Sequence, residues 1–186
     1  ADVAGRIVEV AGVADAPVKA GQVLYRLDPE PFRIALQKAE ATRDDARQRV
    51  MVLRSAHATA EAQLVAAEAL AIARQRELER QQGLLGKGVA SPAALDEAMI
   101  AAQTARNQVA LARDGVRAAA AALGGDPAIA TDAVPAVRAA IALRDAAERD
   151  LRTATVLAPV DGILSQTDGL NVGRYVGAGT MVASVA

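Results

Sequence analysis

Residues 32–82 form a run of 51 residues without a glycine or a proline, and this run limits what the chain can fold into. Pro31 stands just before it, and proline is tolerated in the first turn of a helix but not in its interior. Apolar residues recur along the run at alternating spacings of four and three, the heptad pattern of a helix packed on a partner helix. The expected seam is Phe32, Leu36, Ala39, Arg43, Ala46, Val50, Leu53, His57, Ala60, Leu64, Ala67, Ala71, Arg74 and Leu78.

A second helical segment follows with a cleaner pattern. Its heptad positions are all apolar: Leu95, Ala98, Ala102, Ala105, Val109, Ala112, Val116, Ala119 and Leu123. The three glycines of 83–88 can end the first helix, and Ser91 followed by Pro92 is a helix start with a hydroxyl cap. The sequence therefore predicts an antiparallel helical hairpin with its tip at 83–91.

The returning arm is interrupted at 124–133 by a Gly-Gly-Asp-Pro sequence. The outgoing arm, 31–82, is ~78 Å long at 1.5 Å per residue, whereas 92–123 gives only ~48 Å. The last helical piece, 134–153, adds ~30 Å and closes the difference. We therefore expect 124–133 to be a loop or kink within one returning arm.

The segments that flank the helical zone are rich in valine and glycine and resemble each other. Residues 3–8 match 160–164, and 18–24 match 176–182. Each half reads as short strands turning at glycine, and neither is long enough to bury an apolar face alone. We expect 1–29 and 153–186 to close one small β domain, with 30–152 inserted as the hairpin.

The composition excludes several classes of function. The 47 alanines and only three aromatic residues suit thin helical packing, and the net charge of −1 gives no footprint for nucleic acid. There is no cysteine and one histidine, so we expect no metal, no cofactor and no enzymatic activity.

We interpret His57 as a polar residue tolerated in the seam, the alternative being a pH-sensitive switch. No run of 18 apolar residues occurs, and the chain reads as a fragment of something longer.

The hairpin tip holds the candidate binding residues Arg80, Leu84, Leu85 and Ser91. Ser91 has a structural role as a helix cap, and Arg80 could neutralise a helix C-terminus. Neither role accounts for two leucines at the far end of a thin hairpin. Exposed apolar side chains beside a cation and a hydroxyl are typical of an end-on docking surface.

Arg-x3-Leu-x6-Ser at the tip of a long hairpin that splits two β half-motifs resembles the membrane fusion proteins, or periplasmic adaptors, of tripartite efflux and type I secretion systems. The flanks Val18–Pro29 and Thr155–Gly162 also resemble that family, and the hairpin with its break is most similar to the HlyD/EmrA-type branch. The resemblance implies an α+β fold in which a lipoyl-like domain is split by an antiparallel coiled-coil hairpin.

The resemblance also implies a function. Such adaptors link an inner-membrane transporter, here of MFS or ABC type, to a TolC-like outer-membrane channel for multidrug efflux or protein export. Arg80, Leu84, Leu85 and Ser91 would contact the channel, and six protomers would form a ring. The protein would lie in the periplasm of a Gram-negative bacterium, held to the inner membrane by an N-terminal segment absent from this chain.

Two other classes of function stay open. A freestanding coiled-coil scaffold would explain the heptads but not the matching β halves. A lipoyl or biotinyl carrier domain would explain the halves, but the lysine such a domain modifies lies in a hairpin between them, where this chain has 30–152.

Overall fold

The computed structural model describes residues 2–165 and 170–185 and has an α+β fold. The expected β halves extend over residues 1, 166–169 and 186, which lie outside this range. Contacts divide the chain into two compact units. The β unit comprises the residues up to Ala46 together with those from Pro135 onward, and the hairpin unit is Arg47–Val134. Among the described residues, no helix has both the length and the apolarity needed to cross a membrane.

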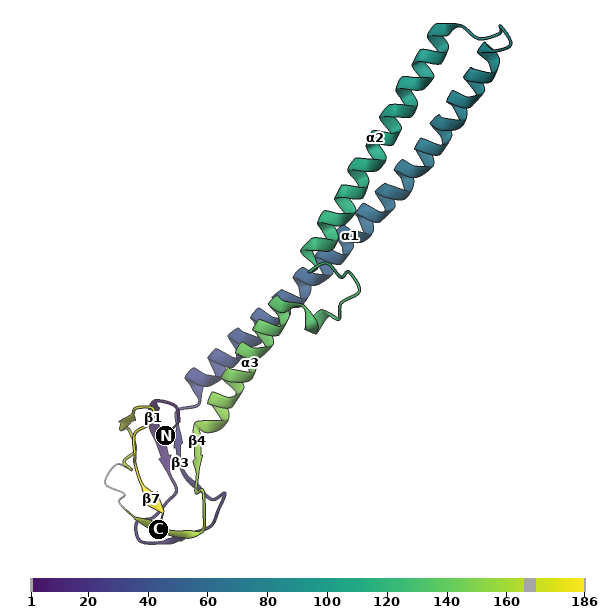
Figure 1. The fold of residues 1–186 in the computed structure, drawn as a ribbon. Coiled ribbons are helices and arrows are strands. Elements are labelled where there is room, and N and C mark those ends of the chain that lie inside the picture. Colours follow the sequence, from purple (N-terminus) through teal and green to yellow (C-terminus); the bar gives the residue numbers. More distant parts are fainter. Residues whose placement is uncertain (1, 166–169, 186) are drawn as a thin grey trace. The chain divides into compact units, whose positions relative to one another are not determined.

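The β unit holds two small antiparallel sheets, which Figure 1 shows around the labels β1, β3, β4 and β7. One sheet has the strand order β4-β3-β1-β6 and the other β2-β5-β7. Two helical segments belong to the same unit, the start of α1 (Glu30–Leu85) and the whole of α3 (Pro135–Thr153). The strands are β1 (Gly5–Val10), β2 (Pro17–Val18), β3 (Val23–Leu27), β4 (Thr155–Leu157), β5 (Gly162–Ser165), β6 (Tyr175–Val176) and β7 (Ser184–Val185).

The two sequence halves exchange strands. β1 of the first half pairs with β6 of the second, with Gly5 opposite Val176. β5 of the second half pairs with β2 of the first, with Val18 opposite Gly162. These are the same repeat positions in both pairings, because Gly5 matches Gly162 and Val18 matches Val176. The internal repeat is therefore a real structural symmetry, and each half completes a sheet of the other.

The matching turns of the two halves also share one geometry. In the first, the Gln22 amide donates to the Lys19 carbonyl at 2.9 Å, and in the second the Thr180 amide donates to Gly177 at 3.3 Å. Each turn has a glycine with positive φ at its third position, Gly21 at 81° and Gly179 at 76°. A side chain at either position would be strained, which explains why glycine recurs there.

One apolar core joins both sheets. Ile7 of β1 and Leu164 of β5 are fully buried and occupy equivalent positions in the repeat. Leu27 at the end of β3 is 1% exposed and lies in the same cluster. The half-buried Phe32 of α1 packs against this core. The core needs few aromatic residues because short strands and small aliphatic side chains fill it.

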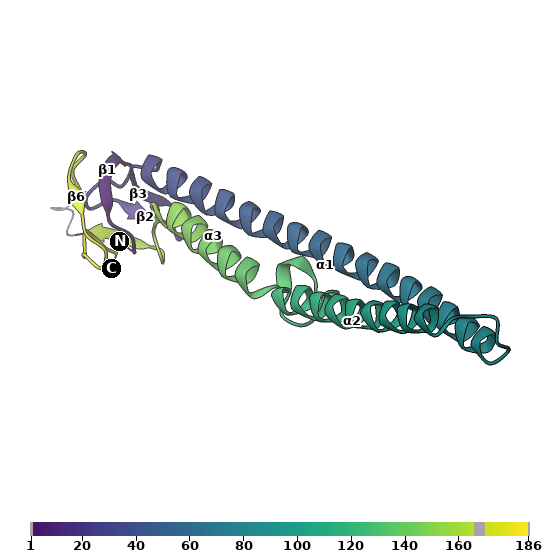
Figure 2. The same ribbon diagram turned by 90° about the horizontal axis from the view of Figure 1, so that it is seen from above.

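The hairpin unit consists of the outer part of α1 and the antiparallel helix α2 (Pro92–Ala122), which lie side by side in Figures 1 and 2. All nine predicted seam positions of the second arm are buried or half-buried, so that prediction is confirmed. Leu78 of α1 packs with Leu95, Ala98 and Ala102 of α2. The seam thus brings the two helices together mainly through small side chains.

The predicted seam of the first arm is wrong at one position. Arg74 is exposed, and its neighbour Gln75 is half-buried in its place, while the other 13 positions are sheltered. A straight helix drifts by ~20° per heptad relative to a strict seven-residue repeat. Six heptads after Phe32, this drift amounts to about one residue. The seam therefore moves from Arg74 to Gln75.

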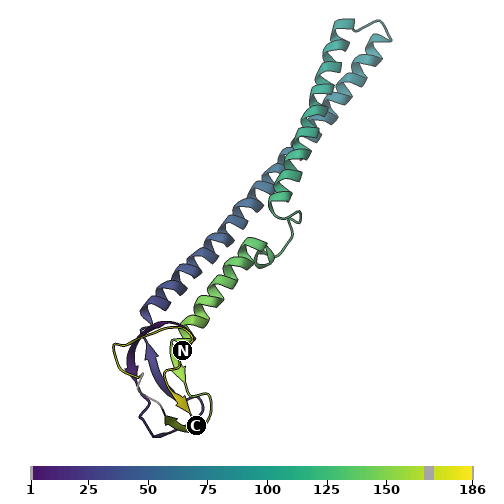
Figure 3. The same ribbon diagram turned by 60° about the vertical axis from the view of Figure 1, so that its left-hand side comes forward.

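The break between α2 and α3 is an ordered loop, which can be followed in Figure 3. It includes the short 3-10 helix η1 (Thr131–Ala133), and its two ends are anchored by the buried side chains of Leu123 and Val134. Two arginines of α1 bind it. Arg47 makes two hydrogen bonds to the Asp132 carboxylate, at 2.9 and 2.8 Å.

Arg54 lies one heptad further along α1 and binds two neutral acceptors of the loop. Its guanidinium donates to the Thr131 hydroxyl at 3.1 Å and to the Ile129 carbonyl. We call the set Arg47, Arg54, Ile129, Thr131 and Asp132 the clasp. Sequence reasoning did not find the clasp, since it joins residues 75 to 85 positions apart.

Candidate docking site at the hairpin tip

The tip turn is built on one backbone carbonyl. The Leu84 carbonyl accepts hydrogen bonds from the amides of Lys87 at 3.2 Å, Val89 at 3.0 Å and Ala90 at 3.4 Å. Helix α1 runs through Gly83, where the sequence predicted a stop, and ends at Leu85. The chain then reverses at Gly88, whose φ of 72° lies in the left-handed region. The turn therefore folds back over the last turn of α1.

Ser91 caps α2, as its position before Pro92 predicted. Its Oγ accepts a hydrogen bond from the Ala94 amide at 3.2 Å, and its backbone is extended, with φ −86° and ψ 151°. The Ala94 amide also donates to the Ser91 carbonyl at 3.1 Å, so the hydroxyl and the carbonyl of Ser91 share this donor of the first helical turn. The hydroxyl is thus committed to the helix, although the residue itself is exposed.

Arg80 does not cap the C-terminus of α1. Its guanidinium donates to Glu77, one turn earlier on the same helix. Glu77 also accepts from the Gln81 side chain at 2.8 Å, so the carboxylate lies between two donors. The Arg80 side chain is 66% exposed. Arg80 and Leu84 are four residues apart and share one face of the helix.

The expectation that Leu84 and Leu85 are exposed is wrong. Both are half-buried, because the turn at 87–90 hydrogen-bonds back to the Leu84 carbonyl and covers the end of α1. The exposed apolar side chain of the tip is Val89, which is 73% exposed. Sequence reasoning passed over Val89 because it lies inside a glycine-rich turn, where the side-chain direction depends on the turn geometry.

His57 lies within the seam of the hairpin unit. Its side chain is 12% exposed, and Nδ1 lies 3.5 Å from a carboxylate oxygen of Glu61, one turn along α1. Among the described residues, no group of three or more His, Cys, Asp or Glu side chains is placed to hold a metal ion. The geometry fits a polar seam residue with a local partner.

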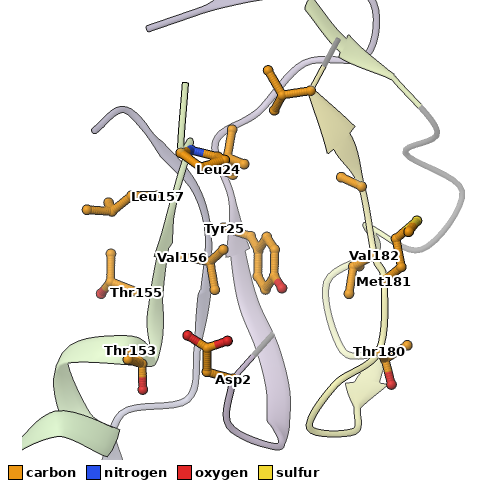
Figure 4. Close-up of a pocket in the computed structure, with 13 residues that line it drawn as sticks. Asp2, Leu24, Tyr25, Thr153, Thr155, Val156, Leu157, Thr180, Met181 and Val182 are labelled. Atoms are coloured by element: carbon orange, nitrogen blue, oxygen red, sulfur yellow. The ribbon is translucent and has the colours of Figure 1, made fainter. Parts of the chain in front are cut away.

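The β unit contains a cavity of about 350 Å³ that the sequence did not predict. Figure 4 shows it between β4 and the segment that carries Thr180, Met181 and Val182, with Tyr25 at its centre. Burial raises the pKa of the Tyr25 hydroxyl, and the negative charge of Asp2 raises it further. Asp2 and Tyr25 are the acidic groups of its described lining, and the other lining residues are apolar or hydroxyl-bearing.

A comparison with protein families decides where the chain belongs. The family described as RND MFP, barrel-sandwich hybrid domain, matches residues 1–186, the whole chain. The chain belongs to this family of membrane fusion proteins. The expected family resemblance is thereby confirmed.

Curated relatives of this membrane fusion protein are named multidrug resistance protein MdtN. The one from Escherichia coli O6:H1 is 34% identical over 175 residues, which covers 87% of this chain and 48% of the relative. The one from Shigella flexneri is 32% identical over 191 residues, covering 95% and 52%. The chain thus spans about half the length of the curated relatives it matches.

Solved structures of membrane fusion proteins are also similar. The periplasmic adaptor protein EmrA has a TM-score of 0.47 at 16% identity, with 100% of this chain and 70% of that chain covered. The soluble domain of LipC, a membrane fusion protein of a type I secretion system, has a TM-score of 0.45 at 15% identity, covering 100% and 97%. The family assignment rests on the family match, since both scores are below 0.5.

Proposed function

We propose that the chain is the hairpin-bearing part of a periplasmic adaptor that links an inner-membrane transporter to a TolC-like outer-membrane channel. The observation that carries this proposal is the family match over the whole chain, together with a long hairpin whose tip exposes a cation and an apolar side chain. The curated relatives are named as multidrug resistance proteins, which favours small-molecule efflux over protein export. The adaptor couples other components and carries out no chemistry itself.

The proposed docking surface is the tip. The sequence indicated Arg80, Leu84, Leu85 and Ser91 as its residues, and we include Val89 because its side chain is exposed. Val89 offers the exposed apolar contact and Arg80 an exposed guanidinium one helical turn before Leu84. Leu84 and Ser91 form the turn that presents them, through a backbone carbonyl and a helix cap. Apolar side chains and arginine are the residue types that dominate binding energy at protein interfaces.

The remaining parts of the proposal concern the assembly. We infer that the transporter is of MFS or ABC type and that protomers associate into a ring, with six as the expected number. The full-length protein would lie in the periplasm, anchored to the inner membrane. The two interlocked β halves support a lipoyl-like fold for the β unit, with the hairpin inserted between them.

A photoreactive residue in the tip of the full-length protein tests the docking proposal. Placed at position 89 or 84 in cells, it is expected to give an adduct with the outer-membrane channel. Val13 provides the matched control, because it is 67% exposed but belongs to the β unit. Adducts at the tip with other copies of the chain alone would support the freestanding scaffold instead.

Intact-mass measurement tests the carrier alternative. The chain is expected to keep its unmodified mass when it is produced together with a lipoyl or biotinyl ligase. Lys19 lies in the turn between β2 and β3 and is the residue to inspect. An added lipoyl or biotinyl group would overturn the adaptor proposal.

A further inference from the structure

The alanine layers at the centre of the seam of the hairpin unit determine its axial register weakly. Ala98, Ala102 and Ala105 are the buried residues of α2, and alanine layers of this kind are nearly interchangeable when one helix slides past the other by a heptad. Coiled coils in general need a polar contact or a distinctive side chain to select one register. The same requirement applies to this hairpin.

The exposed contacts between α1 and α2 do not select a register either. Arg106 donates to Gln75, and Arg113 donates to Glu68 at 3.0 Å. The two arginines are seven residues apart, and so are their two acceptors. A slide of one heptad would therefore place Arg106 opposite Glu68 and form an equivalent pair.

The tip does not prevent such a slide. A heptad slide in an antiparallel hairpin moves the centre of the turn by about half a heptad, three to four residues. Glycines stand at 83, 86 and 88, so the turn has alternative positions within this distance. The observed turn reverses at Gly88, while Gly83 is held within α1.

We propose that the clasp sets the register of α2 against α1. It holds the loop that follows α2, through acceptors of three different kinds: a carboxylate, a hydroxyl and a backbone carbonyl. The Arg47 contact is bidentate and charge-assisted, the strongest and most directional type of side-chain hydrogen bond. Leu123 joins α2 to the loop and is buried. A loop held in one position therefore also holds the end of α2 in one position.

A slide by one heptad cannot reproduce the clasp. In one direction it would bring Asp132 toward Arg54 and leave Arg47 past the end of the loop. In the other direction it would bring Thr131 and Ile129 toward Arg47 and move Asp132 away from both arginines, so the bidentate contact would be lost. Each slipped register therefore loses charge-assisted bonds that the observed register makes. Arg47 and Arg54 act as positioning residues for the tip, whichever partner the tip binds.

Cysteine cross-linking tests this proposal in the chain as it exists, which has no native cysteine. The pair Gln75→Cys with Arg106→Cys reports the observed register, and Glu68→Cys with Arg106→Cys reports a slide of one heptad, ~10 Å along the axis. A short rigid bis-maleimide is the probe. In the wild-type background we expect the 75/106 pair to cross-link and the 68/106 pair to stay nearly unlinked.

The same pairs are then placed in an Arg47→Gln/Arg54→Gln background. The ratio of 75/106 to 68/106 product is expected to fall by about tenfold, the effect of losing one to two kcal/mol of charged hydrogen bonding. Arg117→Gln is the matched control, since Arg117 pairs only along α2 with Asp114 in the contacts seen here. An unchanged ratio in a variant with wild-type helix content would overturn the proposal.

A milder variant covers the case in which the double substitution unfolds the hairpin. Asp132→Asn keeps the size of the side chain and removes the charge that Arg47 binds. It is expected to raise the 68/106 product while the circular dichroism at 222 nm stays at the wild-type value. If Asp132→Asn folds and shows no slipped product, the register is set elsewhere and the proposal is wrong.

Discussion

At Ser91 a single hydroxyl stabilises the start of α2, because its Oγ accepts a hydrogen bond from the Ala94 amide in addition to the one that this amide makes to the Ser91 carbonyl. Ser91→Ala is expected to lower the free energy of unfolding by about 1 kcal/mol. Ser91→Asp is the matched control, since a carboxylate caps equally well and also favours the positive end of the helix dipole. Urea unfolding followed by circular dichroism measures both, and equal stability of the alanine and wild-type chains would show that the cap contributes nothing.

Tyr25 is expected to make the β unit sensitive to alkaline pH. Its pKa is raised in the folded chain by burial and by Asp2, so the unfolded chain loses this proton first as the pH rises. The stabilisation is fully present below the ordinary tyrosine pKa of about 10 and declines as the pH rises toward the folded value. Unfolding measured between pH 8 and pH 11 should show this decline, and Tyr25→Phe should reduce it. An identical decline in Tyr25→Phe would assign the effect to other groups.

At the scale of an element, the tip turn depends on one glycine more than on its neighbours. Gly88 has positive φ, so Gly88→Ala is expected to cost about 1–2 kcal/mol even though its Cβ would meet open space. Gly86→Ala is the control, because its Cβ would make ordinary van der Waals contacts and its backbone is not left-handed. Thermal unfolding of the two variants separates backbone strain from crowding. Equal melting temperatures would contradict the expected strain.

The helices could be predicted from sequence more fully than the way they are held together. The all-apolar heptads of the second arm and the cap at Ser91 follow from local rules, and both are confirmed. The shift from Arg74 to Gln75 depends on drift accumulated over six heptads, which a strict repeat ignores. The clasp depends on where a loop lies against α1, and no spacing in the sequence reports this.

The candidate site shows the same division. The sequence identified the tip and the residues around it, but it expected Leu84 and Leu85 to be exposed and passed over Val89. The exposure of these side chains depends on the backbone, because amides of residues 87–90 donate hydrogen bonds to the Leu84 carbonyl. Side-chain exposure in a turn follows from such bonds, and residue types alone do not predict them.

For the molecule as a whole, the interlocked halves predict that the two sheets lose stability together. Ile7→Ala is expected to cost about 2–5 kcal/mol, because Ile7 is fully buried in the shared core. Hydrogen exchange should then speed up at the Leu164 amide of the second sheet, which donates to Ala16 in the structure. Val8→Ala is the control, since Val8 is 45% exposed. Faster exchange confined to the first sheet would show that the halves are independent.

The proposed adaptor function predicts a loss of export without a loss of folding. Val89→Asp and Arg80→Asp are expected to abolish export in the full-length protein, since each places a negative charge on an exposed part of the tip. Leu84→Asp should also abolish export, but Leu84 is half-buried, so its effect on stability must be measured beside it. Val13→Asp should leave export intact. Normal export by folded Val89→Asp and Arg80→Asp variants would place the docking surface elsewhere.

The strand exchange in the β unit also has a consequence for synthesis on the ribosome. β1 pairs on one side with β3, which follows it closely in the chain, whereas its partner on the other side, β6, emerges about 170 residues later. The hairpin unit, Arg47–Val134, has by then been fully translated and can fold through local contacts. Pairing over such a sequence separation is slow because a long loop must close first. One edge of β1 therefore stays unpaired until β6 has been made, and the sheets of the β unit are completed only after the hairpin unit has been translated.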